Sequence, residues 1–443
     1  RGSMPNDTDV VPGRRIGVQG RTWAVVILLG LVGQVAWTVE NMYLNVFIYN
    51  TITTDPNVIA ITVAASAIAA TLATMLVGAW SDRARTRRPF IALGYVVWGV
   101  LTALFGVIRP GADTTAAIAA AAVAVVALDC VMSFFGSGAN DAAFNAWVTD
   151  STVPGNRGRV ESVLAIMPLI SMLLVFGALD GLTRAGQWTT FFGTVGGLVS
   201  VVGVVGWFLV RDASTLAPPT EGYLTTVLHG LRPASIRENP RLYVLLAGWA
   251  VMGTSTQVFI PYLIIYLQRY LKIEGYAIVL ASVLILASAI SVLGGRVIDR
   301  IGKVRAILPS VAIMVVGLVG MFFARGMLPV IATGTVMMGG FMLSAAAFGA
   351  SVRDATPTDR AGMVQGLRMI AMVLVPMVLG PFIGASVILG ANETYTDLGV
   401  VRQVPTPWIF PAAAVVAILT VFPMVALRRF PAGQPDPGEA ARP

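Results

Sequence analysis

Long apolar runs, separated by short polar stretches, dominate this 443-residue chain. A helix needs about 20 mostly apolar residues to cross the roughly 30 Å hydrocarbon core of a bilayer. Twelve runs reach that length, near residues 23–48, 57–80, 89–108, 116–147, 160–182, 188–210, 242–267, 276–298, 304–324, 328–350, 362–390 and 407–427. Because only helices and closed barrels satisfy their backbone hydrogen bonds within lipid, the pattern predicts an all-α membrane protein with twelve transmembrane helices.

The composition agrees with a membrane protein and argues against an enzyme. Hydrophobic residues make up 56% of the chain and charged residues 12%, with a mean hydropathy of +0.79. The single cysteine, Cys130, cannot form an intramolecular disulfide, and the single histidine, His229, lies in the central polar loop. The sequence contains no Ser-His-Asp set, metal-ligand cluster or phosphate-binding loop, so we expect neither catalysis nor a bound metal or other cofactor.

The basic residues, which are almost all arginines, are unevenly divided between the two sides of the membrane. If twelve spans alternate, most of them fall on the side of both termini and of the loop between the sixth and seventh spans. The opposite side keeps only Arg109, Arg184, Arg269, Lys272, Arg325 and Arg402. This positive-inside pattern predicts a multi-pass protein of the inner (plasma) membrane with both termini in the cytoplasm. The net charge of +8 is then a topology signal and not evidence for nucleic-acid binding.

The chain repeats part of its sequence across a central polar stretch. AAFNAWVTD at 142–150 corresponds to AAFGASVRD at 346–354, and GAWSDR at 78–83 corresponds to GGRVIDR at 294–300. Two parallel repeats of six helices resemble the architecture of the major facilitator transporters, whose substrate site lies between the halves at the midplane. We therefore expect six-helix bundles at 21–210 and 241–429, joined by a cytoplasmic linker at 211–240. We expect cytoplasmic tails at 1–20 and 430–443, the first of which begins with a cloning scar and contains no cleaved signal peptide.

Both repeated motifs place an aspartate and arginines where spans end on the cytoplasmic side. Such an aspartate can pair with an arginine, or accept hydrogen bonds from a helix N-terminus, in one conformation and lose the contact in the other. An alternative is that the arginines only anchor the topology. The expected gating residues are Asp82, Arg83, Arg87, Arg88, Asp150, Arg157, Asp299, Arg300, Asp354 and Arg360.

Three stretches resemble one family of sugar transporters. GAWSDRARTRRPFIALG at 78–94, NDAAFNAWVTDSTVPGNRGR at 140–159 and SIRENPRLYVLL at 235–246 are similar to segments of the glycoside–pentoside–hexuronide cation symporters and their sucrose-transporter relatives. The resemblance implies a symporter that moves a sugar or glycoside.

The chain also departs from that family's pattern. With NMYL at 41–44 aligned to the first span of melibiose-type members, their sugar-binding acid falls on Gln34, and their cation-binding acids in the second span fall near Ala70 and Thr74. The acid of the fourth span remains as Asp141. Because hard cations need several oxygen ligands, we expect H⁺ as the coupling ion in preference to Na⁺.

Three carboxylates inside predicted spans are the candidates for proton coupling. A charged group within the membrane is costly, so Glu40, Asp129 and Asp141 are functional candidates by default. Glu40 projects away from the polar face of the first span, where a low dielectric would favour a protonated carboxyl. The alternatives are that Asp129 is a solvated or structural acid near the outer surface, and that Glu40 and Asp141 only bond to neighbouring helices.

Amides, hydroxyls and aromatic rings on the first, fourth and seventh spans suit a sugar, which offers hydroxyls and apolar ring faces. In an ideal helix Gln34, Thr38, Asn41 and Asn45 share one face. The expected substrate-binding residues are Gln34, Trp37, Thr38, Asn41, Asn45, Asn140, Asn145, Trp249, Gln257 and Tyr262.

Taken together, these features favour a monomeric, proton-driven importer of a glycoside or a related polyol. Two other transport functions stay open: an antiporter that expels lipophilic or cationic compounds, and a lipid transporter. Efflux antiporters of this fold usually have a glycine-proline motif in the fifth span, whereas here LGPFIG lies at 379–384 in the eleventh. A membrane enzyme is disfavoured by the missing catalytic sets.

Overall fold

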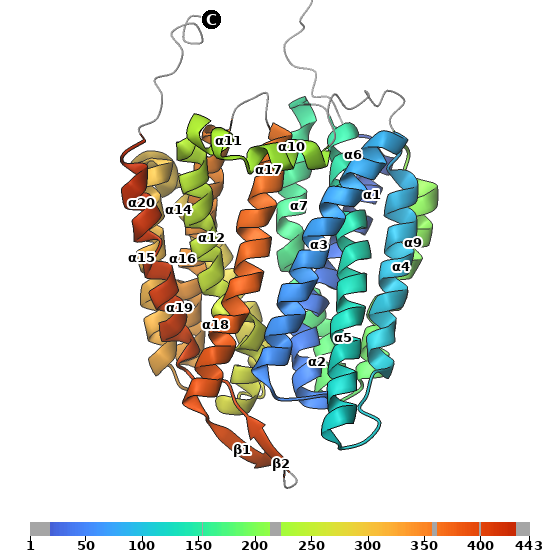
Figure 1. The fold of residues 1–443 in the computed structure, drawn as a ribbon, viewed down its shortest axis with the longest axis vertical. Helices are drawn as coiled ribbons and strands as arrows, with labels where there is room; N and C mark the ends of the chain where they lie inside the picture. The colour runs from blue at the N-terminus through green and yellow to red at the C-terminus, as the bar shows by residue number, and fades with distance from the viewer. Residues whose placement is uncertain (1–17, 153, 213–222, 357–360, 398–399, 431–443) are drawn as a thin grey trace, which may run out of the picture.

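The computed structural model describes residues 18–152, 154–212, 223–356, 361–397 and 400–430. Within this part of the chain, twelve helical spans are long and apolar enough to cross a membrane, which confirms the predicted all-α membrane fold. The first span begins with α1 (Gly20–Thr38) and the last ends with α20 (Val421–Leu427), and both of these ends lie on the same face of the molecule (Figure 1). We call this the terminus face and the opposite one the hairpin face.

The first six spans form the first half of the molecule. Several of them are interrupted by short π-helical or 3₁₀ segments, labelled η. The elements are α1, η1 (Val39–Tyr43), α2 (Leu44–Thr51), α3 (Pro56–Ala84), α4 (Arg88–Leu104), η2 (Phe105–Val107), α5 (Thr115–Gly136), η3 (Ser137–Phe144), α6 (Asn145–Asp150), α7 (Pro154–Leu174), η4 (Val175–Leu179), α8 (Asp180–Arg184) and α9 (Trp188–Leu209).

The second half follows two short helices, α10 (Tyr223–Gly230) and α11 (Pro233–Glu238), which lie along the terminus face (Figure 1). Its elements are α12 (Pro240–Phe259), η5 (Ile260–Tyr262), α13 (Leu263–Ile265), η6 (Tyr266–Tyr270), α14 (Tyr276–Ile301), α15 (Lys303–Phe323), α16 (Met327–Asp354), α17 (Ala361–Met369), η8 (Ile370–Leu374), α18 (Val375–Ala391), α19 (Ile409–Ile418) and α20.

An antiparallel hairpin projects between the last two spans, and the sequence pattern did not predict it. Strands β1 (Thr394–Asp397) and β2 (Val400–Gln403) pair with Thr394 opposite Gln403. The hairpin lies at the end of the molecule away from α10 and α11 (Figure 1). Its strands are only 4 residues each, too short for the alternation of apolar and polar positions to stand out.

Helix ends follow from local chemistry. Pro56 begins α3 with the Asp55 side chain accepting a hydrogen bond from the Asn57 amide at 2.9 Å, and Pro240 begins α12 in the same way with Asn239 as the cap. An acceptor side chain at this position satisfies one of the free amides of the first turn. These caps fix where the second and seventh spans begin.

Close helix contacts in each half depend on glycine. A Cβ at Gly99 in α4 would meet the backbone of Gly196 in α9, and a Cβ at Gly340 in α16 would meet the backbone of Met314 in α15. Small residues allow such close approach in membranes, where van der Waals packing takes over from the hydrophobic effect. By contrast, nothing lies within 4 Å of a Cβ at Gly295, so only Gly294 of that pair faces a neighbour, Leu343.

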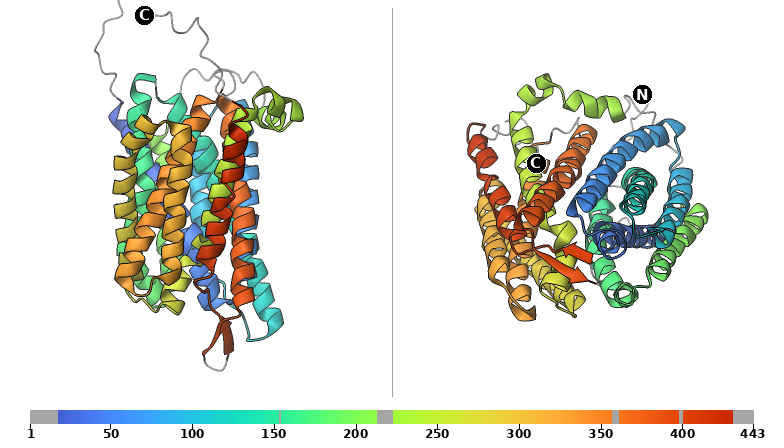
Figure 2. Two further views of the ribbon diagram at one scale, coloured as in Figure 1. Left: turned by 90° about the vertical axis from the view of Figure 1, so that its left-hand side faces the viewer. Right: turned by 60° about the horizontal axis from the view of Figure 1, so that its bottom comes forward.

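The two halves stand side by side and are tied together at the hairpin face (Figure 2). The Tyr262 hydroxyl shares its one proton between the carbonyls of Pro56 at 3.1 Å and Pro381 at 2.8 Å, and Arg269 donates to Asn50 at 2.7 Å. Tyr276 of α14 donates to Asp180 of α8. Every one of these bonds except that to Pro381 crosses from one half to the other, so this face is closed by specific polar contacts.

Candidate substrate and proton site

A cavity of about 460 Å³ lies between the halves, at the middle of the spans and toward the terminus face. Four spans form its wall: the first, second and fourth from the first half and the eleventh from the second half. The lining residues are Gln34, Trp37, Glu40, Asn41, Ser66, Ala67, Ala70, Thr74, Ser137, Asp141, Asn145, Arg368, Met369, Met372, Val373 and Met377. We call it the central cavity.

Six of the residues expected from the sequence meet in the central cavity. They include four of the expected substrate-binding residues and two of the expected proton carriers: Gln34, Trp37, Asn41, Asn145, Glu40 and Asp141. Ala70 and Thr74, the second-span positions where related symporters have acids, also line it. The amide of Asn41 bonds to the Trp37 carbonyl at 2.9 Å, and its side chain is exposed to the cavity.

A π-helical turn decides which residues of the first span face this cavity. In a regular α-helix Glu40 would point away from Gln34 and Asn41, as the sequence analysis expected. Instead, η1 inserts a wider turn at Val39–Tyr43, and Glu40 lines the same cavity as Gln34 and Asn41. The wider turn shifts the angular position of everything after it. Asn45 is accordingly buried, with its amide on the Asn41 carbonyl at 3.0 Å.

Besides Asn45, five more of the expected substrate-binding residues do not line the central cavity in the described structure. Thr38 is buried against Ser171 at 3.1 Å. Asn140 accepts a bond from Trp37 at 3.2 Å and donates to Tyr95 at 2.6 Å, so both the oxygen and the nitrogen of its amide bond to neighbouring helices. Trp249 is buried in a stack with Phe348. Tyr262 belongs to the hairpin-face closure, and Gln257 packs against Gly380.

The three expected carboxyls of the membrane interior lie near one another. Ser133 donates to Glu40 at 2.7 Å, and Glu40 lies within electrostatic range of Asp129 and Asp141. Asp129 is 1% exposed, which corrects the alternative that it is solvated near a surface. One oxygen of Glu40 and one of Asp129 have no hydrogen-bond partner among the described residues. Only Glu40 and Asp141 line the cavity, so Asp129 is the inner member of this acidic cluster.

Two residues of the membrane interior were missed by the sequence analysis. Arg368 was counted among the cytoplasmic arginines, but it lines the central cavity and lies over the Trp249 ring at 5.3 Å. Its position inside the apolar run at 362–390 was the signal that could have identified it. Asp180 was passed over near the end of the fifth predicted span, and it accepts bonds from Tyr43 and Tyr276.

A network of charges holds the terminus face of the first half. Arg87 pairs with Asp82 at 2.5 Å and with Asp150 at 3.1 Å, and it donates to Ser81 at 2.6 Å. Asp212, just after the sixth span, accepts the backbone amides of Arg87 at 2.6 Å and of the next residue at 3.1 Å. The second, third, fourth and sixth spans are thereby joined, all within one half.

The other expected gating residues have different surroundings. Arg88 lies over the Trp207 ring at 4.6 Å, while Arg83 and Arg300 are exposed. In the second half Lys303 pairs with Asp354 at 2.7 Å, a partner that the sequence analysis did not name. The side chains of Arg157 and Asp299, and the whole of Arg360, lie outside the described residues. Among the described residues, no group of three His, Cys, Asp or Glu side chains could hold a metal ion.

The family of this protein follows from a sequence comparison. A family model described as the Major Facilitator Superfamily matches residues 26–381 and 276–442. The chain belongs to this superfamily. This major facilitator protein is therefore a membrane transporter and not an enzyme. A comparison with curated proteins finds no match.

Solved transporter structures share its fold. A bacterial homolog of the human lysosomal transporter Spinster, in an inward-facing occupied conformation, is 16% identical, with a TM-score of 0.71 over 94% of this chain and 98% of that one. A variant of the nucleoside transporter NupG is 13% identical, with a TM-score of 0.71 over 92% and 100%. The xylose transporter XylE from E. coli, partially occluded and inward open, is 13% identical, with a TM-score of 0.67 over 94% and 100%. At these identities the likeness concerns the fold alone.

Proposed function

We propose that this protein is a secondary active transporter that moves a small polar solute, a sugar or glycoside, by proton-coupled symport. The observation that carries the proposal is the meeting of amides, hydroxyls and carboxyls from three spans in the central cavity. Solute and proton would then be bound within one compartment, as symport requires.

The wall contributed by the first half suits a hydroxyl-rich solute. Gln34, Asn41 and Asn145 offer both donors and acceptors, and Trp37 offers a ring edge or face beside them. A volume of about 460 Å³ falls within the range of small-molecule sites and suits one or two sugar rings. The resemblance of residues 78–94 and 140–159 to sugar symporters supports the same substrate class.

Proton carriage is assigned to Asp141 with Glu40 and Asp129. Burying an ionised carboxylate with an unpaired oxygen costs several kcal/mol or more, whereas a protonated carboxyl costs far less. Glu40 and Asp129 each have such an oxygen. Asp141 lines the cavity, so it is the member placed to exchange its proton while the solute is bound.

Alternating access supplies the transport cycle. The hairpin face is closed by bonds between the halves, and the central cavity lies toward the terminus face. With the terminus face in the cytoplasm, as the arginine distribution favours, this arrangement corresponds to an inward-facing state. Opening the hairpin face would require these bonds to break together.

The wall from the eleventh span favours a second candidate. Met369, Met372 and Met377 form an apolar surface opposite the amides. Methionine surfaces adapt to varied apolar groups. A lipophilic or cationic efflux substrate, or a lipid, would contact this wall and the acidic cluster. The direction in which the substrate is transported distinguishes this candidate function from import.

The test is a binding screen followed by transport in proteoliposomes. A thermal-shift screen against mono- and disaccharides, nucleosides and cationic drugs identifies the class, because a ligand that binds the folded state raises its stability. Uptake of the hit is then measured with and without a pH gradient for wild type, Asp141→Asn and the exposed-loop control Asp113→Asn. The proposal predicts gradient-driven accumulation that only Asp141→Asn loses. Stabilisation by lipophilic cations alone, or accumulation that survives in Asp141→Asn, contradicts it.

A further inference from the structure

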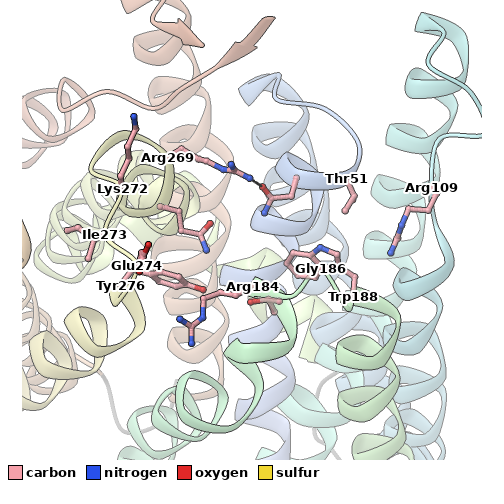
Figure 3. A pocket seen from close by; sticks show the side chains of 13 residues that line it. Thr51, Arg109, Arg184, Gly186, Trp188, Arg269, Lys272, Ile273, Glu274 and Tyr276 are labelled. Atoms are coloured by element: carbon pink, nitrogen blue, oxygen red, sulfur yellow. Dashed lines mark hydrogen bonds between the residues drawn. The ribbon is translucent and has the colours of Figure 1, made fainter. Parts of the chain in front are cut away.

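A second cavity of about 730 Å³ opens at the hairpin face, and its lining includes Asn50, Arg269 and Tyr276 from the contacts that close this face (Figure 3). Both halves line it. Asn50, Arg109 and Arg184 come from the first half, and Arg269 and Lys272 come from the second. We call it the basic cavity. It shares no residue with the central cavity.

The charges of this cavity are strongly unbalanced. Its lining includes four cations, Arg109, Arg184, Arg269 and Lys272, and a single carboxylate, Glu274. These four are most of the six basic residues that the alternating topology assigns to this side, and they come from three separate loops or helix ends, because Arg269 and Lys272 share one. Three separate segments thus converge with one sign of charge, although the face as a whole has few cations.

The contacts of these cations leave donors for a ligand. Arg184 pairs with the buried Asp180 through its Nε at 3.1 Å. Arg269 donates one nitrogen to Asn50 at 2.7 Å, and Arg109 donates one to a neighbouring carbonyl at 2.6 Å. A guanidinium has five N–H donors, so each of the three keeps most of its donors for another acceptor. Lys272 is exposed beside them at the end of the seventh span.

We propose that the basic cavity binds a multivalent oxyanion of the phosphate or diphosphate class between the cations of the two halves. Guanidinium groups bind such oxyanions in bidentate geometry, and a lysine adds a compact charge. The side-chain amide of Gln268 in the same lining adds neutral N–H donors, which hydrogen-bond oxyanions without repelling them. An anion placed there relieves the repulsion among four like charges that share one cavity.

Binding at this site favours one conformation. Arg109 and Arg184 move with the first half, and Arg269 and Lys272 move with the second. An anion held by both pairs binds more tightly when the hairpin face is closed than when the halves separate there. A ligand with such a difference in affinity shifts the population toward the closed state. The site therefore acts as an anion-dependent clamp on the hairpin face.

Two kinds of ligand carry such an oxyanion: a free phosphate compound and a lipid with a phosphate headgroup. Inorganic pyrophosphate tests the first, with protein in detergent and spin labels across the hairpin face. Nanodiscs of phosphatidylglycerol or of phosphatidylcholine test the second. A shift toward shorter distances with pyrophosphate, or in phosphatidylglycerol relative to phosphatidylcholine, identifies the source.

The variants separate a site from general electrostatics. Arg109→Gln with Lys272→Gln removes one cation from each half and none of the bonds described above as closing this face, and Arg325→Gln removes a cation of the same face that does not line the cavity. We expect the double variant to weaken the apparent pyrophosphate affinity by at least about tenfold and to abolish the distance shift, while Arg325→Gln leaves both unchanged. Unfolding of each variant without ligand checks its folding.

Three results overturn the proposal. One is no effect of pyrophosphate or of phosphatidylglycerol beyond that of chloride at equal ionic strength. Another is an equal loss in Arg325→Gln, which would mean simple screening. The third is anion binding with no change in the distances, which removes the clamp. Because the readout is a distance and an affinity for a named anion, none of these results depends on whether a sugar is transported.

Discussion

Replacing Tyr276 with Phe should release the hairpin face without unfolding the protein. The Tyr276 hydroxyl crosses between the halves to Asp180, a carboxylate that is 1% exposed. Phe keeps the ring, so the packing of this buried side chain is retained. The substitution removes a single charge-assisted hydrogen bond, and that bond exists only while the halves meet at this face.

The size of the effect follows from the partners that remain. A hydrogen bond to a charged group contributes about 1.5 to 3 kcal/mol. Asp180 still accepts from Tyr43 at 2.9 Å and still pairs with Arg184 at 3.1 Å, so the lower end of that range applies. A change of about 1.5 kcal/mol shifts the equilibrium between closed and open hairpin faces about tenfold.

Tyr43→Phe is the matched control. It removes a hydrogen bond to the same carboxylate, but Tyr43 belongs to the first half, as Asp180 does. Its loss should lower the thermal stability and leave the population of the two states unchanged. Spin-label distances across the hairpin face measure the populations. Equal shifts in both variants, or no shift with Tyr276→Phe, would refute the reasoning that bonds between the halves hold this face closed.

Three further predictions concern binding, charge and packing. Asn41→Ala should weaken binding of the screened solute by about 1 to 3 kcal/mol, because a bound hydroxyl is left without a partner. Asn140→Ala should instead mainly lower the stability in thermal unfolding, because that amide bonds Tyr95 and Trp37. A larger loss of stability in Asn41→Ala, with a larger loss of binding in Asn140→Ala, would place Asn41 in a helix interface. Arg87→Gln should lower the free energy of unfolding by about 2 to 3 kcal/mol, which is less than for a fully buried pair because its two aspartates are partly exposed. Arg83 is exposed, so Arg83→Gln should change the free energy of unfolding by no more than about 0.5 kcal/mol. Equal denaturation midpoints for the two variants would count against a stabilising role of the Arg87 network. Gly340→Ala should destabilise the protein by about 1 to 3 kcal/mol, because the added Cβ meets the Met314 backbone, whereas Gly295→Ala should be near neutral. The same melting temperature for both variants would show that α15 and α16 can move apart at no cost.

The sequence alone determined the membrane fold. Twelve apolar runs, each long enough to span the bilayer, leave little freedom, because a chain in lipid must satisfy its own backbone hydrogen bonds. The internal repeats indicated the superfamily, because each copy of a motif ends a span at an equivalent place in its half. The intramembrane acids Glu40, Asp129 and Asp141 could also be identified from the sequence, since the cost of burying charge makes carboxylates rare in such apolar runs.

Only the tertiary structure decided which polar residues share a compartment. A regular helix at 100° per residue groups Gln34 with Asn45 and separates Glu40, but the π-helical turn at Val39–Tyr43 reverses that grouping. The periodicity of the first span does not mark such a turn. In the structure Trp37 and Glu40 bond to the fourth span and Thr38 bonds to the fifth. Arg368 and Asp180 were missed for a related reason: their roles depend on Trp249 and Tyr276, residues far away in the chain that only the packing of helices brings to them.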